Sequence, residues 1–136
     1  MSKYFIDTNI VLYANDKRDP QKQCKARTLV VDLMRKGIGV VSTQVLQEYA
    51  SAAMTKLGQP EEVVLRQLTL LETLEVVGQT PRMIRRAVEL KKTYRISFWD
   101  ACIIANAEEA GCTTLYSEDL NTGQFYSGIR VENPLV

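Results

Sequence analysis

Short apolar runs alternate with longer stretches of helical periodicity along this chain. A continuous apolar run is typical of a strand that is buried on both faces of a sheet. Four such runs lie at residues 4–6, 40–41, 74–77 and 113–116. A fifth segment, residues 129–132, alternates apolar and polar residues and therefore predicts a half-exposed strand at the edge of the sheet.

The stretches between these runs predict helices that begin at polar capping residues or proline and end at glycine. Helix starts are marked by Asp19-Pro20, Ser42-Thr43, Pro60, Thr80-Pro81 and Ser97, and helix ends by Gly37, Gly58 and Gly111. A shorter helical pattern covers residues 8–15. Residues 98–105 are apolar almost all round, so their helix is expected to be buried, with Phe98 and Trp99 packed in the core.

Strands that alternate with helices predict a parallel sheet whose two faces are both covered. We therefore expect an α/β fold with a central, mainly parallel sheet of four to five strands, flanked by helices on both faces. A length of 136 residues fits one domain, residues 1–136, better than two. The chain contains no internal repeat and no linker-like stretch.

Composition restricts the chemistry and the compartment. The chain has no histidine, which excludes Ser-His-Asp triads, histidine-ligated zinc and imidazole acid–base catalysis. Its three cysteines are far apart, with no C-x-x-C pair, which fits a reducing cytoplasm rather than a disulfide framework or a zinc site. A charge at Asp7 arrives too soon for the apolar region of a signal peptide, and no apolar run approaches the roughly 18 residues of a membrane span. We therefore expect a cytoplasmic protein without membrane contact.

Four carboxylates lie where a parallel sheet places its ligands. Asp7 ends the first predicted strand, Glu48 lies on the helix after the second, and Asp119 follows the fourth. Asp100 lies in the first turn of the apolar helix and joins them if that helix starts at the same edge. Ligands bind beyond the carboxyl ends of parallel strands, so these four side chains can meet there.

Like charges in one cleft repel each other, so such a cluster persists if a cation fills it. Carboxylate oxygens are hard donors that suit Mg²⁺ or Mn²⁺. A metal ion of this kind can lower the pKa of a bound water and stabilise a transferring phosphoryl group. Phosphodiester hydrolysis is therefore possible without histidine.

Each candidate residue alone also has a purely structural interpretation. Asp7 could cap a helix, Glu48 could be a solvated helix residue, Ser97-x-x-Asp100 is a capping box, and Asp119 fits an ordinary turn. The joint placement of the four acids therefore carries more weight than any one of them. Basic residues cluster at 17–27 and at 82–95, and each cluster fits a solvated helix face or a contact with RNA backbone.

Four segments resemble motifs of the PIN domain family, in particular of its VapC-type toxins. They are Phe5-Ile6-Asp7-Thr8-Asn9-Ile10, Ser42-Thr43-Gln44-Val45-Leu46-Gln47-Glu48, Ser97-Phe98-Trp99-Asp100-Ala101 and Leu115-Tyr116-Ser117-Glu118-Asp119-Leu120. The resemblance covers essentially the whole chain. It implies that Asp7, Glu48, Asp100 and Asp119 form an acidic quartet that binds Mg²⁺ or Mn²⁺.

The resemblance implies a role for each acid. Asp7 and Asp100 are expected to be direct metal ligands, and Asp119 is expected to complete the site. Glu48 is expected to position or deprotonate the attacking water, or to bind a second metal. Thr8, Asn9 and Ser117 either orient ligands and solvent or only form caps and turns.

The resemblance also implies a metal-dependent endoribonuclease that leaves a 3′-hydroxyl and a 5′-phosphate. It implies a toxin that forms a homodimer and is held inactive by an antitoxin in the acidic cleft. A non-catalytic metal- or protein-binding module of the same fold remains an alternative. A receiver-like signalling domain would need an aspartate at the end of a central strand in mid-chain, and residues 40–42 and 74–77 offer none.

Overall fold

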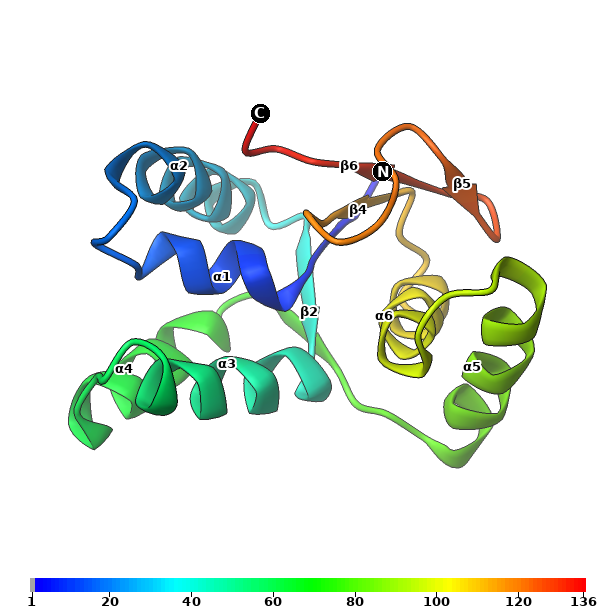
Figure 1. Ribbon diagram of the computed structural model, residues 1–136, viewed down its shortest axis with the longest axis horizontal. Helices are drawn as coiled ribbons and strands as arrows, with labels where there is room; N and C mark the ends of the chain where they lie inside the picture. Colours follow the sequence, from blue (N-terminus) through cyan, green and yellow to red (C-terminus); the bar gives the residue numbers. More distant parts are fainter. Residues whose placement is uncertain (1) are drawn as a thin grey trace.

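Six strands form one sheet at the centre of residues 2–136, which the computed structural model describes (Figure 1). Their bounds are β1 Tyr4–Ile6, β2 Gly39–Ser42, β3 Glu75–Val77, β4 Thr114–Tyr116, β5 Phe125–Tyr126 and β6 Ile129–Glu132. The strand order is β3-β2-β1-β4-β6-β5. All neighbouring strands are parallel except β5 and β6, which are antiparallel. The expected mainly parallel sheet is therefore confirmed.

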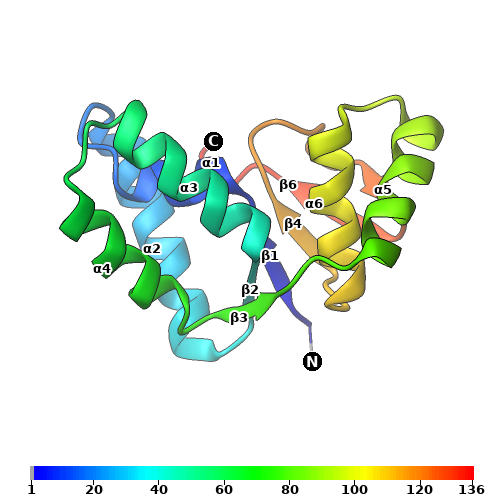
Figure 2. The same cartoon turned by 90° about the horizontal axis from the view of Figure 1, so that it is seen from below.

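Helices cover both faces of the sheet, as the sequence predicts. Their bounds are α1 Thr8–Ala14, α2 Pro20–Lys36, α3 Thr43–Thr55, α4 Glu61–Leu71, α5 Pro81–Tyr94 and α6 Phe98–Glu109. Figures 1 and 2 show α1 to α4 gathered on one side of the strands and the pair α5 and α6 on the other. Across residues 2–136, every helix is too short or too polar to span a lipid bilayer.

The predicted capping residues start their helices by hydrogen bonding. Each of four side chains accepts a bond from the backbone N–H three residues further on, which satisfies one otherwise unpaired donor of the first turn. These caps are Asp19, Ser42, Thr80 and Ser97. Gly37 ends α2 in the left-handed conformation, with φ of 66°, as expected of a glycine at this position.

The edge of the sheet differs from the prediction. β6 alternates buried and exposed residues as expected, but it lies between β4 and β5 rather than at the edge. β5 pairs with it through a two-residue turn, Ser127-Gly128, in which both residues have positive φ. The sheet therefore has six strands, not four to five. β5 was not predicted, because a strand of two residues is too short to show a periodicity. The only sequence signal of the hairpin is the Ser-Gly turn.

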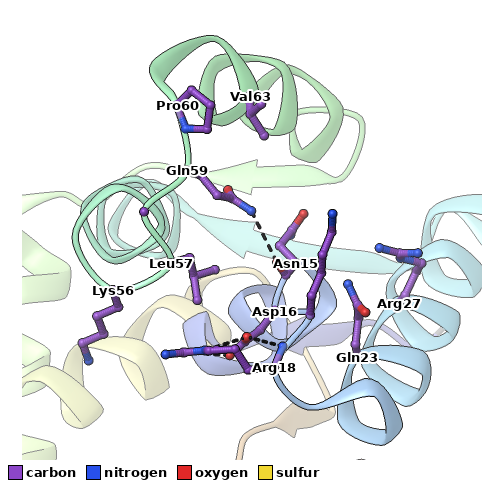
Figure 3. Close-up of a pocket in the computed structure, with 12 residues that line it drawn as sticks. Asn15, Asp16, Arg18, Gln23, Arg27, Lys56, Leu57, Gln59, Pro60 and Val63 are labelled. Atoms are coloured by element: carbon purple, nitrogen blue, oxygen red, sulfur yellow. Dashed lines mark hydrogen bonds and ion pairs between the residues drawn. The ribbon is translucent and has the colours of Figure 1, made fainter.

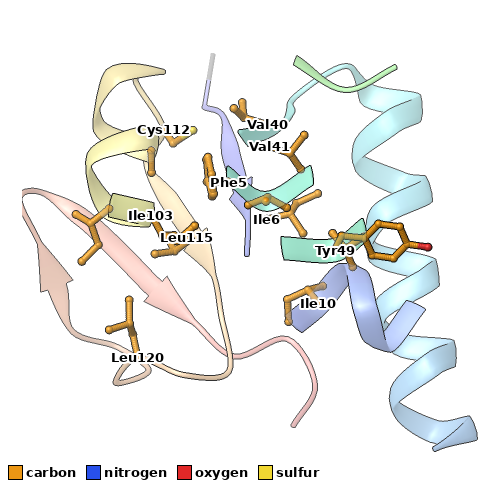
Figure 4. Close-up of a cluster of buried hydrophobic side chains, with 14 of the residues drawn as sticks. Phe5, Ile6, Ile10, Val40, Val41, Tyr49, Ile103, Cys112, Leu115 and Leu120 are labelled. Carbon is orange, nitrogen blue, oxygen red and sulfur yellow. The ribbon is translucent and has the colours of Figure 1, made fainter. Parts of the chain in front are cut away.

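The core lies between the two layers of helices. Figure 4 shows Phe5, Ile6, Val40, Val41 and Leu115 gathered around the central strands, and all five are fully buried. Residues 101–107 of α6 are also buried, which confirms the prediction for that helix.

The first turn of α6 departs from the predicted core. Trp99 is 64% exposed, so the expectation that it packs in the core is wrong, and Phe98 is only partly buried. The two rings contact each other in a T-shaped arrangement with centroids 5.2 Å apart. The reason is positional: α6 is continuously buried only from Ala101 onward, so its first turn lies outside the core.

The start of β2 leaves no room for a side chain, and we expect Gly39→Ala to destabilise the protein. A Cβ at Gly39 would lie 2.7 Å from Leu74 Cδ2 and 3.0 Å from Leu33 Cβ. Overpacking of this kind should lower the free energy of unfolding by about 1–3 kcal/mol, measurable by urea denaturation. Gly78→Ala is the matched control, since a Cβ there meets no atom within 4 Å. Equal stability of the two variants would contradict the tight packing.

Candidate active site

Asp7 directly follows β1, and the parallel pairing of β1 with β4 determines its neighbours. Ile6 lies opposite Tyr116, so Asp7 comes to lie beside Ser117 at the carboxyl ends of both strands. The Ser117 hydroxyl donates a hydrogen bond to Asp7 Oδ2 and the Thr8 backbone N–H donates one to Oδ1, each at 2.7 Å. Asp7 also caps α1 and is only 4% exposed. The capping role and a place in the acidic site are thus combined in one residue.

Ser117 also positions the loop that carries Asp119. Its Oγ accepts a hydrogen bond of 3.1 Å from the Asp119 backbone N–H. One hydroxyl therefore donates to the carboxylate after β1 and accepts from the backbone after β4.

Asp100 reaches the same place from the first turn of α6. The Ser97 hydroxyl accepts a hydrogen bond of 3.0 Å from the Asp100 N–H, but within residues 2–136 the Asp100 carboxylate makes no return bond to Ser97. The carboxylate is therefore not occupied by helix capping. One oxygen each of Asp7, Asp100 and Asp119 lies within 4.8 Å of the others, so the predicted convergence of these three acids is observed.

A buried polar network fixes the first turn of α6 against the start of α3. Gln44 Nε2 donates a hydrogen bond of 3.3 Å to the carbonyl of Trp99, the residue just before the acid. Gln44 Oε1 accepts hydrogen bonds from Asn106 Nδ2 at 3.3 Å and from Gln79 Nε2 at 3.2 Å. Asn106 Nδ2 also donates to Ser42 Oγ at 2.9 Å. This network ties the turn that carries Asp100 to the carboxyl end of β2.

The sequence analysis assigned no role to Gln44 or Asn106. A signal was nevertheless present, because Asn106 is the one amide in the apolar stretch 101–107. Buried amides require partners, so this position pointed to a polar contact inside the fold.

Glu48 lies outside the group of three carboxylates but is connected to it. The Thr8 hydroxyl donates a hydrogen bond of 2.8 Å to Glu48 Oε1, while the Thr8 backbone N–H binds Asp7. The structure therefore brings Asp7, Asp100 and Asp119 close enough together to bind one ion. Glu48, the fourth predicted acid, is connected to this group only through Thr8. Thr8 is the link between them.

Asn9 contributes unused polar atoms to this region. Its side-chain nitrogen and oxygen are both buried, and neither forms a well-aligned hydrogen bond within residues 2–136. The amide lies close enough to Asp119 to offset part of the rise in pKa that desolvation and the charge of Asp100 cause in that carboxyl. Buried amide atoms of this kind normally have a partner, which a bound ion's water molecules would supply.

Burial and mutual repulsion make the three acids hard to ionise together. Desolvation above all, together with the charges of Asp119 and Asp100, raises the pKa of Asp7 to about 7, although the hydrogen bonds from Ser117 and Thr8 oppose the rise. Desolvation and then the charge of Asp100 also raise the pKa of Asp119. A cation in the cluster would reverse both effects. All three side chains offer hard carboxylate oxygens, so the donor set fits Mg²⁺ or Mn²⁺.

Glu118 is adjacent to the cluster in sequence but is occupied elsewhere. Lys22 Nζ lies 2.7 Å from its Oε2, and the Tyr13 hydroxyl donates a hydrogen bond of 3.1 Å to its Oε1. Its charge is thus compensated outside the group formed by Asp7, Asp100 and Asp119.

The metal-free protein should lose stability as the pH rises from about 4 to about 7. The pKa of Asp7 is about 7 in the folded protein against an ordinary value of 3.8, so the folded state retains a proton that the unfolded chain releases. Asp7→Asn still caps α1 but cannot ionise. With EDTA present, the variant should unfold at a higher urea concentration than wild type near pH 8, and the difference should vanish near pH 4.

The matched control is Asp32→Asn, on the exposed side of α2, which makes the same chemical change outside the acidic cluster at a residue that, within residues 2–136, is paired only with Lys36 on its own helix. A metal-free Asp7→Asn protein that is less stable than wild type near pH 8 would contradict the raised pKa.

Comparisons with known structures show the same fold in several proteins. VapC20 of Mycobacterium tuberculosis, described as a sarcin-ricin loop cleaving toxin, is 20% identical with a TM-score of 0.69, over 94% of this chain and 99% of that one. The DNA-bound VapBC of Salmonella typhimurium is 18% identical with a TM-score of 0.72, over 98% and 99%. A toxin–antitoxin complex from Klebsiella pneumoniae is 20% identical with a TM-score of 0.71, over 97% and 98%.

A comparison with curated protein sequences finds no match. The model of the PIN domain family, in contrast, matches residues 4–126, which span every strand up to β5 and all helices of the described chain. The match includes each of the four predicted acids, and it agrees with the structural likeness to the VapC toxins. The chain therefore belongs to the PIN domain family.

Proposed function

We propose that this protein is a metal-dependent endoribonuclease whose site consists of Asp7, Asp100 and Asp119, with Glu48 beside them. The observation that carries the proposal is the meeting of three carboxylates within 4.8 Å at the carboxyl edge of a parallel sheet. A cluster that desolvation and repulsion oppose is expected to have a function. The likeness to VapC20, a toxin that cleaves the sarcin-ricin loop, supports RNA as the substrate.

Asp7, Asp100 and Asp119 would hold the ion, which we propose to be Mg²⁺ or Mn²⁺. When bound, it supplies charge stabilisation for the phosphoryl group and a more acidic water. The hydrogen bonds from Ser117 and Thr8 orient the Asp7 carboxylate in advance. Orientation by such neighbours strengthens metal sites in general.

Glu48 is suited to accept the proton of the attacking water. Its Oε1 is engaged by the Thr8 hydroxyl, and among residues 2–136 no side chain donates a hydrogen bond to its Oε2. The water oxygen forms a bond to phosphorus as its proton passes to Glu48, the bond from phosphorus to the 3′ oxygen breaks, and that oxygen takes up a proton from solvent, so the products carry a 5′-phosphate and a 3′-hydroxyl. A carboxylate in this position is a common general base.

We further propose that the protein is the toxin of a toxin–antitoxin pair. Several proteins of the same fold are toxins or toxin–antitoxin complexes, which supports this role. An antitoxin segment in the acidic cleft would block RNA, and a cationic side chain is the group that the metal-free cluster would attract most strongly. We also expect a homodimer, in line with the VapC-type toxins that the sequence resembles.

Asp100→Asn should abolish Mg²⁺-dependent RNA cleavage, with a loss of about 100-fold or more, because it removes one of three metal ligands. Cleavage is measured by sequencing the ends of RNA incubated with the purified protein, and circular dichroism checks the fold. Glu62→Gln, an exposed residue of α4, is the control and should cut normally. If Asp100→Asn cuts RNA as fast as wild type, the site assignment is wrong.

Glu48→Gln should separate catalysis from metal binding. Loss of a general base should slow cleavage by about 100-fold or more. Because Glu48 is not among the three converging carboxylates, Mn²⁺ affinity measured by calorimetry should fall much less than in Asp100→Asn. An equal loss of affinity in the two variants would instead make Glu48 a direct metal ligand.

A further inference from the structure

Two adjoining cavities lead away from the acidic cluster, between the α1–α2 connection and the α3–α4 connection. The first has a volume of about 240 Å³, and Asn9 and Asp119 form part of its wall. The second has a volume of about 450 Å³ and is shown in Figure 3. The two share four lining residues: Asp16, Arg18, Lys56 and Leu57. We refer to both together as the basic channel.

The larger cavity of the channel has a charge opposite to that of the acidic cluster, whereas the smaller one combines Arg18 and Lys56 with Asp16, Glu118 and Asp119. The larger cavity is lined by four cationic side chains and a single acidic one. The cations are Lys17, Arg18, Arg27 and Lys56, and the acid is Asp16. Within residues 2–136, neither Lys17 nor Lys56 forms an ion pair, and both are exposed. Cationic groups thus lie directly beside the site that would bind the reacting phosphate.

Arg18 is held in position before any ligand binds. Its Nε and Nη2 each donate to the carboxylate of Asp16 at 2.9 Å, and its backbone N–H donates to the same carboxylate at 3.0 Å. The Arg18 side chain is nevertheless 69% exposed, so its remaining N–H groups are accessible. Figure 3 shows the guanidinium on the side of the cavity where Lys56 lies. An ordered guanidinium loses little further entropy when it binds a phosphate.

In the other basic cluster of the sequence, two arginines are engaged in ion pairs. Arg82 and Arg86 on α5 form ion pairs with Glu109 and Glu108 at the end of α6, which is remote from Asp100 at its start. These two arginines join the helices. Arg82 and Arg86 are thus occupied within the fold, whereas Lys91, Lys92 and Arg95 of the same cluster are exposed.

We propose that the basic channel binds the sugar–phosphate backbone of single-stranded RNA next to the scissile bond. Arg18, Lys17 and Lys56 contact its phosphates. The proposal rests on the proposed ribonuclease function and adds the path of its substrate. Such contacts carry no sequence information but fix the position of the strand on the site. Among the described residues, no aromatic side chain lines the larger cavity and Tyr13 alone lines the smaller one, so backbone contacts are favoured over successive base stacking.

The test is the salt dependence of RNA binding, measured by fluorescence anisotropy of a labelled single-stranded RNA in EDTA. Each phosphate contact contributes about 0.7 to the slope of log affinity against log salt for single strands. Lys17→Gln/Lys56→Gln should therefore reduce this slope by about 1.4 and shrink the affinity loss between about 50 and 200 mM salt roughly sevenfold. Arg18→Lys should weaken binding with little change in slope, since it keeps the charge but loses the planar group that Asp16 holds in position.

Lys3→Gln/Lys36→Gln is the matched control. It removes the same charge, but Lys3 precedes β1 and Lys36 precedes β2, so both lie at the opposite edge of the sheet. An unchanged slope in Lys17→Gln/Lys56→Gln, with normal RNA cleavage by wild type, would contradict the proposal that the channel binds RNA and leave the ribonuclease proposal intact. An equal decrease of the slope in the control variant would also contradict RNA binding by the channel. A wild-type protein that neither binds nor cuts RNA would overturn both proposals.

Discussion

Three carboxylates stay within 4.8 Å of one another in this fold because other contacts hold them against their mutual repulsion. Asp7 is held most firmly, since it is buried, caps a helix and accepts hydrogen bonds from Thr8 and Ser117. The pairing of β1 with β4 makes the contact with Ser117 unavoidable, because Ile6 and Tyr116 are in register. Backbone geometry thus opposes an electrostatic cost that a divalent ion would remove. Metal binding and stability are therefore expected to be coupled in this protein.

The position of Asp100 depends on polar groups inside the core rather than on apolar packing. Gln44 and Asn106 connect the start of α3, the end of β2 and the first turn of α6. Within residues 2–136, Asn106 Oδ1 has no hydrogen-bond partner despite its burial, so the network is not optimised for stability alone. Such a network favours one arrangement of the helices over others, which is what a metal site requires.

Local patterns in the sequence predicted much of the fold and of the site. The ends of parallel strands placed Asp7 and Asp119 at one edge, and the motif around Asp100 added the third acid. The features that the local patterns did not predict are determined by contacts between segments distant in the sequence. The pairing of Arg82 and Arg86 with α6 depends on how two helices meet, and the exposure of Trp99 depends on where the core ends. Neither is encoded in a local periodicity.

The hydrogen bond between Ser117 and Asp7 joins residues that are 110 positions apart. At a synthesis rate of roughly 5–20 residues per second, the second of these residues is added about 5–20 s after the first. A growing chain therefore contains β1, its helices and most of its core before it contains the strand that completes the acidic cluster. The order of the elements along the chain delays assembly of the acidic cluster until the segment after β4 has been synthesised.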